Sequence, residues 1–303
     1  MPKVYDQIGK DQVIFNRLWK PQQWSGGRTI QATVKFAMNS QGGSYAGLEV
    51  LNATKETTRT RADWGRPRQL YQPVVFDNLD ISLNKNEQFF DLVDQEMAEM
   101  KDSLQDKVCT QLHGDGTGNS NKNLLGLIAG ADDGTNVGTY GGIVRSTYTW
   151  FKGYYNASGG VLATSTMATA WDACKSGNNA PTFIDTTEAM WTAYEDLLTP
   201  QARYNFDSQG YPKVDGGFDA LFFRKAPVIA DEYCASGYMW FLNEKTWVLH
   251  YVKHAKHPTD SKGFTLRPMA EPTNQDGQVG YLLFAGELVC TEPRRNGCVR
   301  GLS

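Results

Sequence analysis

A glycine-rich segment is the first place in this sequence where residue types and spacing could support chemistry. The segment GDGTG at 114–118 could cradle a phosphate, but a P-loop requires a lysine directly after its last glycine, and Asn119 follows Gly118. A calcium-binding EF-hand loop beginning at Asp115 would need glycine where Ser120 stands and glutamate where Gly126 stands. We therefore interpret 114–118 as a helix cap and turn.

Histidines and cysteines are the next candidates, because both bind metals. His250, His254 and His257 would share one face of a helix, but the segment before them has the composition of a strand and Pro258 follows at once. The five cysteines lie far apart without a C-x-x-C pair, so we expect free, mostly buried thiols and neither a disulfide framework nor a metal site. They are Cys109, Cys174, Cys234, Cys290 and Cys298.

The sequence contains no pattern that is typical of a hydrolase. The sequence has no G-x-S-x-G nucleophile elbow. The acid pairs Asp132–Asp133 and Glu195–Asp196 lie in a predicted loop and near a helix end, without the two contrasting environments that acid–base catalysis requires. We predict that the protein is not an enzyme and uses no cofactor.

The last candidate site is the basic segment 53–68, which we place at the tip of an extended hairpin. Arginine and tryptophan are favoured at protein interfaces, so we interpret the segment as a contact between subunits. A nucleic-acid patch, with the tryptophan stacking on a base, and a solvated loop are the two alternatives. The candidate contact residues are Lys55, Arg59, Arg61, Trp64, Arg66 and Arg68.

The composition of the chain argues against several classes of function. The chain has 303 residues and a net charge of −3, which argues against a protein that binds nucleic acid by neutralising phosphates, although it is compatible with a wall around DNA. No segment reaches the roughly 20 apolar residues of a membrane helix, and the N-terminus lacks the apolar core of a secretory signal. We expect no membrane association and no export.

The elements that would position these residues follow from periodicity. Residues 1–40 predict an extended arm that ends in a strand at 29–38, and two extended runs at 44–52 and 68–83 predict a long hairpin around the basic tip. Apolar residues spaced three and four apart predict a helix over 86–112, which would be roughly 40 Å long. Strands and helices then mix without a βαβ repeat, which indicates an α+β fold.

The second half of the chain carries several shorter elements. We expect a helix at 165–175 and a buried strand at 181–187, where Asp185 and Glu188 would form a capping box for a second helix. Further strands are predicted at 218–231, 239–252 and 279–290.

The order of these elements resembles the major capsid proteins of tailed double-stranded-DNA bacteriophages. The resemblance covers about residues 40 to 300 and includes the long helix ending in HGDGTGN, then YGGIVRSTYTWF, and PTFIDTTEAMWTAYEDLLTPQARY at 181–204. It continues in GFDALFFRKAPVIADEYCASGYMWFLN at 217–243. The same fold is used by encapsulins and by the herpesvirus capsid floor.

The resemblance implies a division of the chain. It assigns 1–40 to an N-terminal arm, 41–83 to an extended loop, 84–154 to a peripheral domain with the spine helix 86–112, 155–275 to an axial domain, and 276–303 to a return to the peripheral domain. It also implies self-assembly into hexamers and pentamers that form an icosahedral head enclosing double-stranded DNA without sequence-specific binding.

Partners follow from the same resemblance. A portal protein would occupy one vertex, and a decoration protein is compatible with the shell. Because 1–40 lacks the charged helical scaffolding segment that some relatives carry, we expect either a separate scaffolding protein or removal of such a segment before this sequence begins. Lys55 and Asn296 are residue types that could cross-link, but neither lies in a motif that supports this. Two alternatives stay open: an encapsulin-like nanocompartment shell, and a monomeric sugar-binding or hydrolytic domain that uses the many aromatic side chains.

Overall fold

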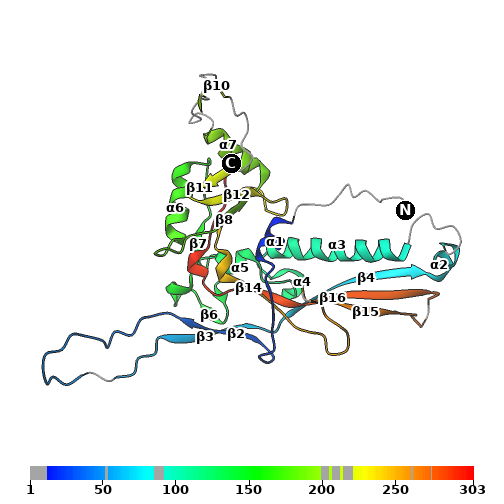
Figure 1. Cartoon of the computed structure of the whole chain (residues 1–303), viewed down its shortest axis with the longest axis horizontal. Helices are drawn as coiled ribbons and strands as arrows, with labels where there is room; N and C mark the ends of the chain where they lie inside the picture. The colour runs from blue at the N-terminus through cyan, green and yellow to red at the C-terminus, as the bar shows by residue number, and fades with distance from the viewer. Residues whose placement is uncertain are drawn as a thin grey trace.

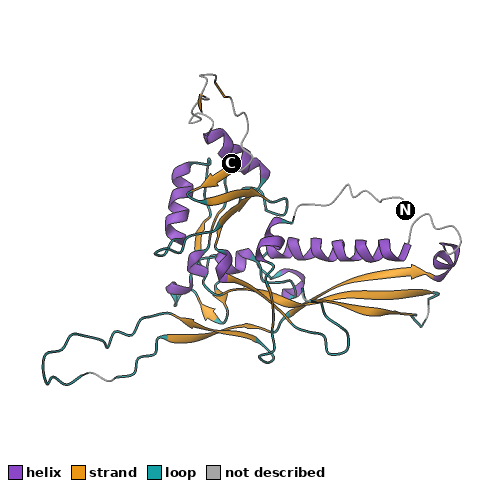
Figure 2. Ribbon diagram, in the orientation of Figure 1, coloured by secondary structure: helices purple, strands orange, loops and turns teal. Residues whose placement is uncertain are grey.

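The computed structural model describes residues 12–51, 54–84, 92–198, 205–206, 212–213, 221–260, 262–273 and 275–303. Its three parts are an upper unit of helices around a mixed sheet, a flat arm of long strands under one long helix, and a thin hairpin that projects away from both (Figures 1 and 2). None of the helices in these residues has the length and apolar character needed to cross a bilayer.

The arm is built on the strand β16 (Gly277–Cys290), which pairs along most of its length with β4 (Arg68–Asp77). Beside them lie β15 (Phe264–Ala270), β14 (Trp247–Tyr251) and β1 (Pro21–Gln23). The helix α3 (Leu92–Leu112) covers β4 and β16 (Figure 1). Its apolar face is buried at Met100, Leu104 and Val108, as the periodicity predicts, while the predicted first turns at 86–91 lie outside the described residues.

The upper unit is a six-stranded mixed sheet with its own core. The strand order is β11 (Leu221–Phe223), β12 (Ala226–Ala230), β8 (Phe183–Thr186), β13 (Met239–Leu242), β17 (Gly297–Val299) and β7 (Tyr154–Asn156). The helices α6 (Thr164–Cys174) and α7 (Glu188–Leu198) pack against it, and both match predicted helices.

The two sheets do not follow the division into an axial domain at 155–275 and a returning segment at 276–303 that the resemblance implies. β14 and β15 pair with β16 in the arm, whereas β17 near the C-terminus completes the sheet of the upper unit. β17 belongs to the upper unit because it pairs with β13, and β13 pairs with β8 on its other side. The chain therefore crosses between the two units twice after residue 242.

The hairpin is formed by different strands from the predicted ones. β2 (Ile30–Lys35) pairs with β3 (Arg59–Gly65), so the outer end of the hairpin is the connection between these strands. The described part of the predicted run 44–52, residues 44–51, is not a strand. The run 68–83 splits into β4, which belongs to the arm, and the helix α2 (Asn78–Asn84). Local alternation could not reveal this, because the partner of β4 lies about two hundred residues further along the chain.

Two smaller expectations are also corrected. The predicted extended arm contains a helix: α1 (Val13–Leu18) buries Ile14, Phe15 and Leu18 in the core, and β1 then pairs with β14. Asp185 is not a helix cap, because it lies inside β8 and is fully buried. Thr187 precedes α7 instead, and its hydroxyl accepts a hydrogen bond from the Met190 N–H at 3.4 Å.

The remaining elements are short. In the residues that the structure describes they are α4 (Gly118–Asn121), α5 (Leu127–Ala131), β5 (Thr139–Tyr140), β6 (Ile143–Val144), β9 (Asn205–Phe206), β10 (Pro212–Lys213) and the 3-10 turns at Thr149–Phe151, Glu244–Thr246 and Pro293–Arg295. The glycine-rich segment 114–118 follows the end of α3, as the helix-cap interpretation predicts.

Candidate assembly surface

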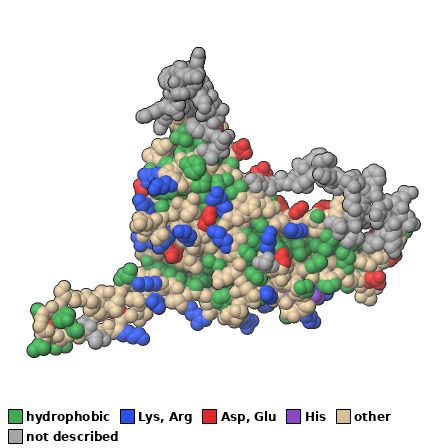
Figure 3. Space-filling model, viewed as in Figure 1, with side chains coloured by type: hydrophobic (Ala, Val, Ile, Leu, Met, Phe, Trp, Pro, Cys, Tyr) green, Lys and Arg blue, Asp and Glu red, His purple; other side chains and the backbone are tan. Residues whose placement is uncertain are grey.

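The outer loop of the hairpin carries exposed apolar side chains. Leu48 and Val50 are 104% and 99% exposed, and Tyr45 and Leu51 are also largely exposed. We call these four residues the tip cluster; Figure 3 shows hydrophobic side chains gathered at the outer end of the projection. A two-stranded hairpin is marginally stable alone, and such a cluster on a thin projection marks an interaction site.

The six candidate contact residues do not all lie where the sequence analysis placed them. Lys55 lies in the outer loop, and Arg59 and Arg61 are exposed on β3, between the tip cluster and the body. Arg66 is exposed in the turn that follows. None of the ion pairs in the described part of the chain involves these four cations.

Trp64 anchors the hairpin to its own subunit. Its side chain is buried and meets the Tyr140 ring edge-on at 6.0 Å. The backbone N–H of Asp63 donates to the carbonyl of Gly141 at 2.8 Å, and Gly141 has φ +58°. A Cβ at Gly141 would lie 3.2 Å from the Trp64 indole, so this glycine allows the close approach. Trp64 therefore sets the direction of the hairpin and is buried before any partner arrives.

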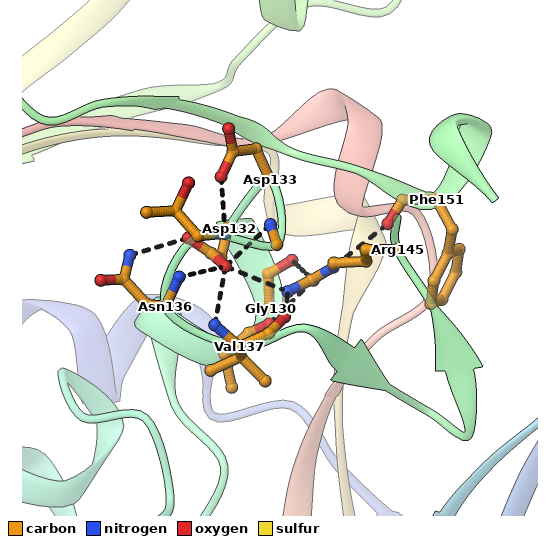
Figure 4. A network of polar contacts seen from close by, with 10 residues as sticks. Gly130, Asp132, Asp133, Asn136, Val137, Arg145 and Phe151 are labelled. Atoms are coloured by element: carbon orange, nitrogen blue, oxygen red, sulfur yellow. Dashed lines mark hydrogen bonds and ion pairs between the residues drawn. The ribbon is translucent and has the colours of Figure 1, made fainter. Parts of the chain in front are cut away.

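The loop that receives Trp64 is held by a buried guanidinium. Arg145 has no exposed surface and donates to the carbonyls of Ala129, Gly130, Val137 and Phe151 at 2.8–3.3 Å (Figure 4). Burial lowers its pKa, and the carboxylate of Asp132 at 3.7 Å opposes that effect.

Asp132 in turn organises the loop on its other side. Its carboxylate accepts hydrogen bonds from the backbone N–H groups of Gly134, Asn136 and Val137 at 2.9–3.0 Å (Figure 4). The loop from 129 to 151 is therefore rigid because its carbonyls are bound by Arg145 and its N–H groups by Asp132. Asp132 was predicted only as a candidate catalytic acid, and Arg145 was not predicted at all, because a single arginine in the sequence gives no indication of burial.

Arg68 forms the second anchor of the hairpin. It begins β4 and donates to Glu287 on β16 at 2.5 Å, and the same carboxylate accepts the Leu125 N–H at 2.5 Å. Glu287 is fully buried, and burial raises its pKa to about 7 although Arg68 acts in the opposite direction. Two of the six predicted contact residues, Trp64 and Arg68, therefore bind within the subunit.

The buried position of Glu287 predicts a pH dependence of stability. Its pKa is raised in the folded subunit, so the folded state holds a proton more tightly than the unfolded chain, and stability falls as pH rises from about 4.5 to about 7. We expect the free energy of unfolding of wild type, relative to Glu287→Gln, to fall by about 3 kcal/mol across this range. Urea denaturation of unassembled subunits at several pH values measures this difference. A difference that stays constant or rises with pH contradicts the prediction.

The other residues considered for chemistry are dispersed. His250 lies on β14, whereas His254 and His257 lie in the following loop, so the three share no helix face. The five cysteines are free and buried, as predicted. Asn296 is fully buried, and its side chain bonds to Asn243, Thr246 and Trp247 within the subunit.

Comparison with known proteins identifies the fold. No family model and no curated protein matches this sequence. The capsid protein of cyanophage A-1(L) is similar in structure, with a TM-score of 0.75 at 16% identity, covering 100% of this chain and 96% of that one. The SrpI encapsulin of Synechococcus elongatus gives 0.64 at 10% identity, covering 100% and 92%. The capsid of cyanophage P-SCSP1u gives 0.58 at 13%, covering 99% and 91%.

These similarities cover 99–100% of this chain and 91–96% of the other chains. The chain therefore has the α+β fold shared by tailed-phage capsid proteins and encapsulins, and the resemblance in sequence order is confirmed at the level of the fold.

Proposed function

We propose that this chain is the major capsid protein of a tailed bacteriophage, a structural subunit that assembles into an icosahedral head and performs no catalysis. The observation that carries the proposal is the tip cluster. A thin hairpin that holds Leu48 and Val50 fully in water is explained by a neighbouring subunit that covers them. The full-length match in fold to the cyanophage A-1(L) capsid supports the same function.

The anchors at the base of the hairpin support this mechanism. Trp64 and Arg68 fix its direction within the subunit, so the tip cluster is presented at a defined distance from the body. Preorganisation of this kind lowers the entropy lost on association. Many modest contacts closed by symmetry then make a stable shell.

We further propose hexamers and pentamers of this chain, a portal protein at one vertex and a separate scaffolding protein. The location is the virion, after assembly in the host cytoplasm. The enclosed genome is double-stranded DNA held without sequence-specific contacts, and a net charge of −3 fits a wall to which packed DNA does not adhere.

Electron microscopy with size-exclusion chromatography of the purified protein, with and without its scaffolding partner, tests the proposal. We expect closed shells or rings of five or six subunits. A stable monomer under every condition would contradict the capsid function and favour a monomeric binding domain. Particles purified from the native source distinguish the two shell functions, because a phage head contains DNA and an encapsulin contains a protein cargo.

Charge reversal on β3 tests the role of the exposed arginines. We expect Arg59→Glu combined with Arg61→Glu to reduce the yield of shells at least tenfold. Neither arginine forms an ion pair with the described residues of its own subunit, and the introduced glutamates would repel the carboxylates on a neighbour that the arginines attract. The circular dichroism spectrum of the subunit should stay unchanged. The matched control Arg59→Lys with Arg61→Lys keeps the charge and should assemble. Wild-type yields of intact shells from the reversed variant would refute an interface at β3.

A further inference from the structure

A buried group of three metal-ligand side chains lies where the arm meets the upper unit. His113 directly follows α3, Asp185 lies in β8, and Cys234 lies in the turn after β12. Their ligand atoms lie within 4.8 Å of one another, and all three side chains are buried. The group therefore joins the long helix of one unit to the sheet of the other, at a position that the hairpin and the proposed shell contacts do not use.

The orientation of His113 leaves one nitrogen available to a ligand. Its Nδ1 lies 3.3 Å from the backbone carbonyl oxygen of Cys109. A carbonyl oxygen can only accept, so Nδ1 carries the proton and donates it. Nε2 then faces Asp185 Oδ2, also at 3.3 Å. A metal-binding histidine shows this arrangement, with one ring N–H fixed by a backbone carbonyl and the other nitrogen turned to the ion.

The distances fit ligands of one ion better than a direct ion pair. Charge-assisted hydrogen bonds from nitrogen to a carboxylate are usually about 2.7–2.9 Å long, shorter than the 3.3 Å seen here. Two ligands of a tetrahedral zinc ion, each about 2.0 Å from the metal, lie about 3.3 Å apart. The ligand atoms of the group lie within 4.8 Å of one another, so the sulfur of Cys234 has to approach by up to roughly a further 1 Å on binding the ion.

Two unpartnered polar atoms border the group. Asp185 Oδ1 is buried without a hydrogen-bond partner, and so is the indole N–H of Trp240. Burial raises the pKa of the Cys234 thiol, and the nearby indole acts in the opposite direction. A buried polar group without a partner is costly, so each of these atoms indicates an interaction still to be made.

The charges of the group also favour a cation. Asp231, whose carboxylate accepts the backbone N–H groups of Ile14 at 3.2 Å and Tyr233 at 2.8 Å, acts electrostatically on both His113 and Asp185. With Asp185 ionised and Cys234 as a thiolate, the two carboxylates and the sulfur carry three negative charges, against the one positive charge of Arg17, which also acts on Asp185. A divalent ion would balance these charges.

We propose that His113, Asp185 and Cys234 bind one zinc ion that fastens α3 to the sheet of the upper unit. Nitrogen, oxygen and sulfur ligands together select zinc over magnesium or calcium, which prefer oxygen alone. Three protein ligands leave a fourth position for a water molecule. With zinc bound, the Cys234 thiolate accepts the Trp240 indole N–H, and Asp185 no longer shares a proton with His113.

Metal analysis of the full-length subunit tests this proposal. Wild type refolded with zinc and passed through a desalting column should retain about one zinc ion per chain by mass spectrometry. Cys234→Ser and Asp185→Asn should each retain less than a tenth of that amount. The matched control Cys174→Ser removes a buried thiol that belongs to no group of three metal-ligand side chains in the described part of the chain, and should retain the zinc.

Cobalt substitution of wild type keeps the test decisive if the variants fold poorly. Cobalt bound in place of zinc should give the visible absorption of a tetrahedral site with a thiolate-to-cobalt band. Folded wild type that retains less than a tenth of an ion per chain would overturn the proposal and leave His113 and Asp185 as a proton-sharing pair. Zinc retained equally by Cys234→Ser and Asp185→Asn, or cobalt without the thiolate band, would overturn it as well.

Discussion

Replacing both Leu48 and Val50 by aspartate is expected to abolish shell formation while leaving the subunit folded. The two side chains are almost fully exposed in the single subunit, so the substitutions disturb no contact within it. In a shell each aliphatic side chain contributes about 1.5–3 kcal/mol when it is buried, and this loss recurs at every equivalent contact. Two carboxylates in an apolar contact add an unpaired-charge penalty. We expect at least a hundredfold fewer closed particles by negative-stain microscopy.

The matched control for this experiment is Leu48→Met combined with Val50→Ile. It preserves the apolar character and approximate volume of the tip cluster, so shells should form at close to the wild-type yield. Circular dichroism and the urea midpoint of unassembled subunits should be the same for all three proteins. Closed particles at wild-type yield from the aspartate variant would show that the tip cluster is not buried on assembly.

Replacing Arg145 by methionine is expected to lower the free energy of unfolding of the subunit by about 3–5 kcal/mol. The substitution removes every hydrogen bond that Arg145 donates to the buried carbonyls of Ala129, Gly130, Val137 and Phe151. It also leaves the buried carboxylate of Asp132 without its nearby cation. The flexible methionine side chain fills much of the volume, so the loss is mainly polar. Urea denaturation of unassembled subunits measures the change.

A matched control at an exposed arginine separates the effect of losing the buried contacts from the effect of replacing an arginine by methionine. Arg66 is exposed and forms no ion pair with the described residues, so Arg66→Met should change the free energy of unfolding by about 0.5 kcal/mol or less. The Arg145 variant should also assemble poorly, because the loop that it stabilises receives Trp64 at the base of the hairpin. A loss below about 1 kcal/mol for Arg145→Met would contradict the role assigned to this network.

The candidate surface was only partly predictable from the sequence. The basic segment 53–68 indicated an interface, but the structure places Trp64 and Arg68 inside the subunit and the exposed apolar residues at 45–51 at the outer end. Tryptophan and arginine side chains are found both in interfaces between subunits and in buried contacts within one subunit. Only the packing of Trp64 against Tyr140 distinguishes the two locations.

The sequence by itself determined the features that depend on near neighbours. The spacing of apolar residues predicted α3 and α7, because helix periodicity is a local property of the chain. The wide spacing of the cysteines likewise predicted free, buried thiols. The order of elements was sufficient to recognise the fold.

Only the tertiary structure decided which distant segments meet. β3 pairs with β2 instead of β4, β4 pairs with β16 about two hundred residues away, and His113 meets Asp185 across 72 residues. Alternation shows that a segment can form a strand, yet backbone hydrogen bonds are the same for every sequence and do not name the partner. The partner is chosen by the side chains that the whole fold buries together, which is why the hairpin register and the buried polar groups appeared only in three dimensions.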